Sequence, residues 1–242
     1  MLLEVIVQSV ADAVAAEAGG AGRLEVVREI ERGGLTPSVD LVHEIRSATA
    51  LPLRVMVREN DGFEVGPGEL PTLRDAARRL EDAGVDGIVI GFARAGALVL
   101  DDLARVLAAA PGVRATFHRA FDSLSDPLAA IDALLSIDQV DRVLTSGGDG
   151  TAAQRVERLR DYAVRPGTTD PSPQGTGSVS SPSRLTIIAG GGVTEEMVSL
   201  LACAGAIREV HVGRAAREGE DPSAAVSAVR VRRLCDLISQ SS

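Results

Sequence analysis

Short apolar runs alternate with amphipathic stretches along almost the whole chain. Each apolar run ends in a turn, and apolar residues then recur at every third or fourth position, as they do on one face of a helix. The runs predict eight strands, at residues 2–7, 23–27, 53–57, 87–90, 114–118, 142–145, 185–189 and 209–212. A helix is predicted after each strand, at residues 11–18, 38–48, 73–83, 100–109, 127–136, 151–162, 195–204 and 223–239. Eight strand–helix units favour an α/β fold, the (β/α)8 TIM barrel, with residues 1–242 in a single domain.

One segment interrupts this rhythm. Residues 165–183 are rich in Pro, Gly, Ser and Thr and lack apolar periodicity, which predicts a flexible insertion between the sixth helix and the seventh strand. Such a connection lies on the barrel face opposite the active site. We therefore expect the insertion to leave the site intact.

Charge and composition exclude several classes of protein. The formal net charge of -9 argues against nucleic acid or an anionic membrane as the main partner. All 25 basic residues are Arg, so a Schiff-base lysine and a Walker-type lysine are both excluded. The apolar start of the chain is too short and too acidic for a signal peptide, and no apolar run is long enough to span a membrane. We expect a cytoplasmic protein.

The stretch 117–122, Phe-His-Arg-Ala-Phe-Asp, is the strongest candidate for chemistry. It gathers His118, Arg119 and Asp122 at the predicted end of the fifth strand, where TIM barrels carry their active sites. Together with Glu25 and Arg58, these residues are the candidate catalytic groups, with His118 as acid or base and the arginines holding an anion. The structural alternative is a buried histidine that donates to a backbone carbonyl, beside an Arg–Asp pair that fixes a loop.

Three carboxylates, Glu4, Glu25 and Glu209, stand in otherwise apolar strands, and a buried carboxylate needs a partner. They either form ion pairs at the barrel floor with Arg23, Arg58 or Arg208, or they help to bind a polar or anionic small molecule. Further candidates for anion binding follow the strands, because glycine-rich βα loops often hold phosphate. These candidates are Glu4, Thr145, Ser146, Gly147, Gly190, Gly191, Gly192, His211 and Gly213.

A metal site is not defined by any motif. His118 and His211 with a carboxylate could ligate a divalent ion, yet the chain has no H-x-H, H-E-x-x-H or C-x-x-C spacing. The spacing of these residues therefore assigns no metal ligands and no cofactor.

The motifs together resemble the CutC family, described as copper homeostasis proteins. The resemblance is nearly full length and rests on segments in family order: 3–5, 23–25, 33–38, 117–122, 142–148, 189–193 and 209–211. It implies a TIM barrel, a homodimer or larger homo-oligomer, and a role in copper homeostasis and copper ion binding. Family members often carry cysteines at positions that here hold Ile6 or Val7, and Val27, and those thiols are natural Cu(I) ligands.

Two functions therefore follow from the sequence. The resemblance implies a CutC-type protein whose partner is a copper ion. The alternative is a metal-independent TIM-barrel enzyme, of isomerase or lyase type, that acts on a small phosphorylated or carboxylated metabolite.

Overall fold

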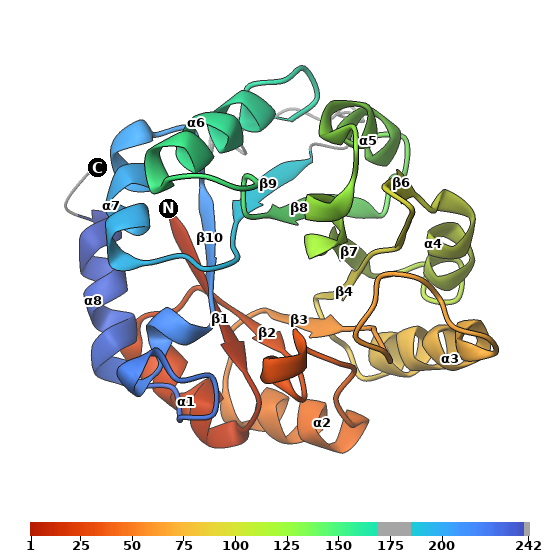
Figure 1. Ribbon diagram of the computed structural model, residues 1–242. Coiled ribbons are helices and arrows are strands. Elements are labelled where there is room, and N and C mark those ends of the chain that lie inside the picture. Colours follow the sequence, from red (N-terminus) through yellow and green to blue (C-terminus); the bar gives the residue numbers. More distant parts are fainter. Residues whose placement is uncertain (169–184, 240–242) are drawn as a thin grey trace, which may run out of the picture.

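A closed barrel of eight parallel strands forms the centre of the molecule, with the helices in a ring around it (Figure 1). The computed structural model describes residues 1–168 and 185–239. Around the barrel the strands follow the order β1-β10-β9-β8-β7-β4-β3-β2. Their bounds are β1 Leu2–Val7, β2 Arg23–Val26, β3 Leu53–Met56, β4 Gly87–Ile90, β7 Arg114–Phe117, β8 Val140–Thr145, β9 Thr186–Ala189 and β10 Glu209–Val212. The predicted TIM barrel is confirmed.

The helices that cover the barrel agree closely with the predicted ones. They are α1 Val10–Gly19, α2 Val39–Ala48, α3 Glu69–Asp82, α4 Leu100–Leu107, α5 Pro127–Leu134, α6 Ala152–Ala163, α7 Glu195–Ala204 and α8 Ala228–Ser239. Side-chain oxygens cap several of them: Ser9, Ser38 and Asp126 accept from backbone N–H groups in the first turns of α1, α2 and α5.

The largest differences from prediction lie at two helix starts and one loop. Helix α3 begins at Glu69, earlier than predicted. Helix α8 begins at Ala228, later than predicted, because residues 221–226 form a turn around Asp221 and a bridge between Val226 and Arg217. A short hairpin, β5 Ala93–Arg94 and β6 Ala97–Leu98, follows β4 and was not predicted.

Alternating side chains divide the interior into two parts. Leu3, Val5 and Val7 are buried in the large apolar core, while Glu4 belongs to a polar cluster inside the barrel. A second, small apolar cluster of Val27, Met56 and Val89 forms apart from that core. The barrel interior therefore contains both charged and apolar layers.

The predicted insertion is only partly described. Its first residues, 165–168, form a turn in which the hydroxyl of the buried Thr168 lies 2.8 Å from the carbonyl oxygens of both Tyr162 and Arg165 and its one hydrogen is shared between them. The rest of the predicted insertion, 169–183, lies outside the described residues.

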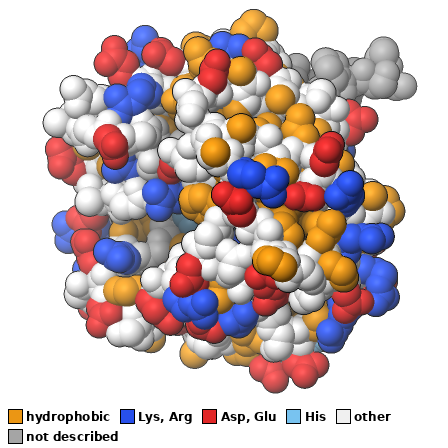
Figure 2. Space-filling model, turned by 45° about the vertical axis from the view of Figure 1, so that its right-hand side comes forward, with side chains coloured by type: hydrophobic (Ala, Val, Ile, Leu, Met, Phe, Trp, Pro, Cys, Tyr) orange, Lys and Arg blue, Asp and Glu red, His pale blue; other side chains and the backbone are white. Residues whose placement is uncertain are grey.

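Among the described residues no helix is long and apolar enough to cross a bilayer. Acidic and basic side chains are interspersed over the face shown in Figure 2.

Candidate functional site

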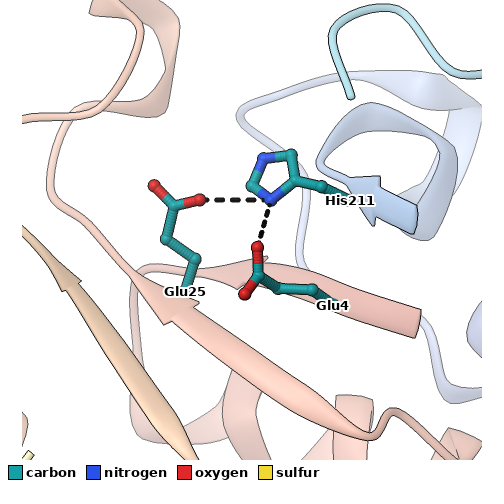
Figure 3. A group of neighbouring side chains, drawn as sticks. All are labelled: Glu4, Glu25 and His211. Carbon is teal, nitrogen blue, oxygen red and sulfur yellow. Dashed lines mark hydrogen bonds and ion pairs between the residues drawn. The ribbon is translucent and has the colours of Figure 1, made fainter. Parts of the chain in front are cut away.

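Glu4, Glu25 and His211 form a buried cluster inside the barrel (Figure 3). They come from the neighbouring strands β1, β2 and β10, and the strand register pairs Glu4 directly with His211. The Nδ1 atom of His211 lies 2.8 Å from Glu4 Oε1 and 3.1 Å from Glu25 Oε2. One ligand atom from each residue lies within 4.8 Å of the others.

Below this cluster, an ion network continues toward the N-terminal ends of the strands. Arg23 contacts the carboxylates of Glu4 and Glu209. Arg142 Nε lies 2.9 Å from Glu209 Oε2 and also contacts Asp141. Arg54 then donates to both oxygens of Asp141, at 2.9 and 2.7 Å. The structural alternative is thus correct for Glu209, whereas Glu4 belongs to both the network and the cluster.

These surroundings give the three cluster residues different protonation behaviour. Burial disfavours the charged form of Glu4, but Arg23 and His211 outweigh it and hold the pKa of Glu4 well below its usual range. Burial raises the pKa of Glu25 to about 7, and the neighbouring Glu4 acts in the same direction. Although burial opposes it, the two carboxylates raise the pKa of His211. Glu25 Oε2 has no hydrogen-bond partner in the described part of the chain, since its 3.1 Å approach to His211 lacks hydrogen-bond geometry.

A pocket of about 460 Å³ opens above the cluster at the C-terminal ends of the strands. This volume suits a small molecule. Of the predicted site residues, eight line it: Glu25, Arg58, His118, Arg119, Gly191, Gly192, His211 and Gly213.

His118 is buried in the pocket wall and is held by the loop that follows it. Its Nδ1 accepts a hydrogen bond from the backbone N–H of Ala120 at 3.1 Å. Burial, together with the charges of Arg58 and Arg119, lowers the pKa of His118 to about 3. The ring is therefore neutral near pH 7, with its proton on Nε2. The expected donation to a backbone carbonyl is replaced by acceptance from a backbone N–H.

Asp122, predicted to be catalytic, instead joins two loops. Its Oδ1 accepts from the Thr145 hydroxyl at 2.6 Å and from the Ser146 N–H at 3.0 Å. Its Oδ2 pairs with Arg119 Nε at 2.9 Å. Asp122, Thr145 and Ser146 are outside the pocket lining, and the bonds from Thr145 and Ser146 to the Asp122 carboxylate hold the β7 and β8 loops together.

Some of the glycines predicted to bind an anion lie in the pocket lining and others do not. The N–H of Gly147 donates to the Thr145 hydroxyl and that of Gly190 to the Thr145 carbonyl, so neither can bind a ligand. Gly191 and Gly192 line the pocket, and both have positive φ angles, 84° and 63°, that favour glycine.

The sequence reasoning missed several lining residues. Met56 and Phe63 come from β3 and the loop after it, and Glu31 and Arg214 from the loops after β2 and β10. Arg214 directly follows Gly213, which was already a candidate, so its place in that loop could have indicated that it lines the pocket. Nothing local marks Phe63, which reaches His118 with ring centroids 5.5 Å apart.

Comparison with known proteins identifies the family. The CutC family model matches residues 1–169, more than half of the chain. The chain belongs to the CutC family. A CutC family protein of Treponema denticola is 31% identical over 91% of this chain and 84% of its own length. The mouse copper homeostasis protein cutC homolog is 32% identical over 81% of this chain, and the match spans 66% of the mouse protein, just under two thirds.

Solved structures share the barrel. The CutC protein of Streptococcus agalactiae superposes with a TM-score of 0.72 at 21% identity, covering 87% of this chain and 97% of its own. Phosphoribosylanthranilate isomerase of Thermotoga maritima gives a TM-score of 0.61 at 10% identity, covering 99% of this chain and 98% of its own. At these identities the likeness shows the fold alone. Within this CutC family pocket, Ile6 and Val27 are apolar lining residues where the resemblance implied cysteines.

Proposed function

We propose that this CutC family protein acts in copper homeostasis by binding Cu(II) at Glu4, Glu25 and His211. The observation that carries the proposal is the buried cluster itself, with three potential ligand atoms within 4.8 Å at the base of a pocket. Two carboxylates and one imidazole are ligands that a divalent ion can take, and because the pKa values of Glu25 and His211 are raised, metal binding would release the protons that these groups hold. At a given site of nitrogen and oxygen ligands, Cu(II) binds more tightly than the other divalent first-row metals.

The donor set favours Cu(II) over Cu(I). Cu(I) prefers thiolate ligands, but Ile6 and Val27 occupy the pocket wall. The chain's two cysteines lie elsewhere: Cys203 is exposed in α7, and Cys235 is half-buried in α8. A thiolate site in the barrel is therefore not available.

Calorimetric titration with Cu(II), in a phosphate-free buffer that does not bind copper, tests this role. We expect one tight site in the native protein and a loss of at least tenfold in affinity in Glu25→Gln and in His211→Gln, because each removes one ligand. The matched controls are Glu31→Gln, which changes an exposed carboxylate at the same pocket, and His43→Gln, which removes an exposed histidine on α2. If His211→Gln binds Cu(II) as tightly as His43→Gln, the copper site is elsewhere and the proposal fails.

This role carries two further expectations. We place the protein in the cytoplasm and in a homodimer or larger homo-oligomer. Subcellular fractionation tests the first, and light scattering coupled to size-exclusion chromatography tests the second.

A further inference from the structure

The pocket is lined by more cationic groups than the overall charge of the protein leads one to expect. Arg58, Arg119 and Arg214 line it, against the carboxyl groups of Glu25 and Glu31, in a chain of net charge -9. Three guanidinium groups against two carboxyl groups leave an excess of cationic side chains in this pocket, and such an excess attracts anionic ligands. The cations therefore need an explanation that the metal cluster does not give.

Arg58 is fixed in place without a counter-ion. Its guanidinium donates to the backbone carbonyls of Gly33 and Gly62, each at 3.2 Å, and to that of Asp61. It also lies 5.3 Å from the centre of the Phe63 ring. Within the described part of the chain it forms no ion pair, so its charge is held at the pocket without being neutralised by a contacting carboxylate.

Arg119 and Arg214 have donors to spare. Arg119 uses Nε to pair with Asp122, and among the described residues its two Nη groups have no hydrogen-bond partner. The guanidinium packs against Gly191, where an added Cβ would lie 2.6 Å from Arg119 Nε. Arg214 is exposed, and among the described residues its guanidinium has no hydrogen-bond or ion-pair partner.

Three successive backbone N–H groups in the same wall are also without partners. The carbonyls of Gly191 and Gly192 accept from Arg155, which turns this loop in a fixed direction. The N–H groups of Gly191, Gly192 and Val193 donate to nothing in the described parts of the chain, whereas the N–H of Gly190 is already used. Successive free N–H groups form an anion-binding concavity.

We propose that this pocket binds a small phosphomonoester, with its phosphate held by the N–H groups of residues 191–193 and by Arg119 and Arg214. A phosphate dianion has three oxygens that accept hydrogen bonds, which suits several amides and planar guanidinium groups together. Arg58 adds charge from the loop after β3. The organic part of the ligand packs against the apolar wall of Ile6, Val27 and Met56.

The anion site is separate from the proposed copper ligands. None of its arginines or amides belongs to the Glu4, Glu25 and His211 cluster. The inference therefore goes beyond the copper role and stands or falls without it.

The test uses the full chain stripped of metal on a chelating resin, because a soluble carboxylate chelator would compete for the same site. Inorganic phosphate and glycerol 3-phosphate are titrated by calorimetry, and ¹H–¹⁵N spectra follow the amides of Gly191, Gly192 and Val193. We expect saturable binding that shifts these amide signals, with glycerol 3-phosphate binding at least as tightly as phosphate. Arg214→Gln should weaken binding about tenfold, since it removes a charge-assisted contact.

The matched control is Arg105→Gln, which removes an exposed arginine on α4 outside the pocket and should bind like the native protein. Equal phosphate affinity in the two variants overturns the proposal, as does saturation with no shift at residues 191–193. If succinate binds more tightly than both phosphate compounds, the ligand is a carboxylate and the phosphomonoester assignment is wrong. Because the copper titration is run without phosphate and this one without metal, either proposal can fail alone.

Discussion

The buried, neutral His118 should make the protein sensitive to acid, and His118→Asn should remove that sensitivity. Asparagine keeps an acceptor for the Ala120 N–H but carries no titrating group. In the native protein the His118 pKa is lowered from 6.5 to about 3, first by burial and then by the charges of Arg58 and Arg119. Protonation is therefore easier in the unfolded chain than in the folded one.

The direction and size of this pH effect on stability follow from the difference between the His118 pKa values in the folded and unfolded states. The folded state binds this proton less tightly, so the stability contributed by neutral His118 is complete above pH 6.5 and is lost as the pH falls from 6.5 toward 3. Each pH unit below 6.5 lowers the free energy of unfolding by about 1.4 kcal/mol, so that about 2 kcal/mol has been lost at pH 5. His118 is only 4% exposed, so solvent screening does not reduce this much.

Urea unfolding followed by far-ultraviolet circular dichroism measures the effect, because the chain has no Trp. The quantity compared is the difference in unfolding free energy between native protein and variant at pH 7.5 and at pH 5. Comparing native protein with variant is necessary because Glu25 also titrates in this pH range. Its pKa is raised, so Glu25 stabilises the fold as the pH falls, and this contribution cancels when the variant is subtracted from the native protein.

The difference should move by about 2 kcal/mol in favour of His118→Asn at the lower pH. His43→Asn, which replaces an exposed histidine on α2, is the matched control. A His118→Asn difference that is the same at both pH values, within about 0.5 kcal/mol, would refute the account of His118 as a buried neutral ring.

Three other substitutions test the site by unfolding. Arg23→Met should cost about 3–5 kcal/mol of unfolding free energy, because Glu4 and Glu209 lose a buried partner. Arg78→Met, in the exposed ion pairs of α3, is the control and should leave the unfolding midpoint almost unchanged; similar losses in the two variants would contradict the ion network. Gly191→Ala should lower the free energy of unfolding more than Gly192→Ala. Both place alanine in the left-handed region, at about 1–2 kcal/mol, but only the Cβ at position 191 would collide with Arg119. Equal losses would mean that Arg119 moves away freely. Asp122→Asn should cost about 1.5–3 kcal/mol through the charge-assisted bonds to Arg119, Thr145 and Ser146, and an unchanged midpoint would rule out its bracing role.

The barrel was predictable because its signals are local. A short apolar run followed by a helical period identifies each βα unit, and eight such units leave few other folds. Helix α8 shows the limit of that approach. Its start depends on the Asp221 turn and the Arg217–Val226 bridge, a tertiary contact that no local pattern contains.

The candidate site was predicted at the level of strand ends but not of contacts. Glu25, His118 and His211 could be placed at the barrel mouth by strand position alone. Whether Asp122 faces the ligand or the next loop depends on the loop conformation, which brings Thr145 and Ser146 to its carboxylate. Phe63 lies in the long loop after β3, so its approach to His118 follows from the fold and not from the sequence pattern.

Arg155 has a consequence for how the barrel mouth moves. From α6 it donates to the carbonyl of Ser146 in the β8 loop and to those of Gly191 and Gly192 in the β9 loop. Two segments about forty-five residues apart in sequence thereby share one side chain, and neither can open without releasing it. Hydrogen exchange at the two loops should accordingly proceed as one cooperative opening event, with a common rate that rises at both together when Arg155 is replaced.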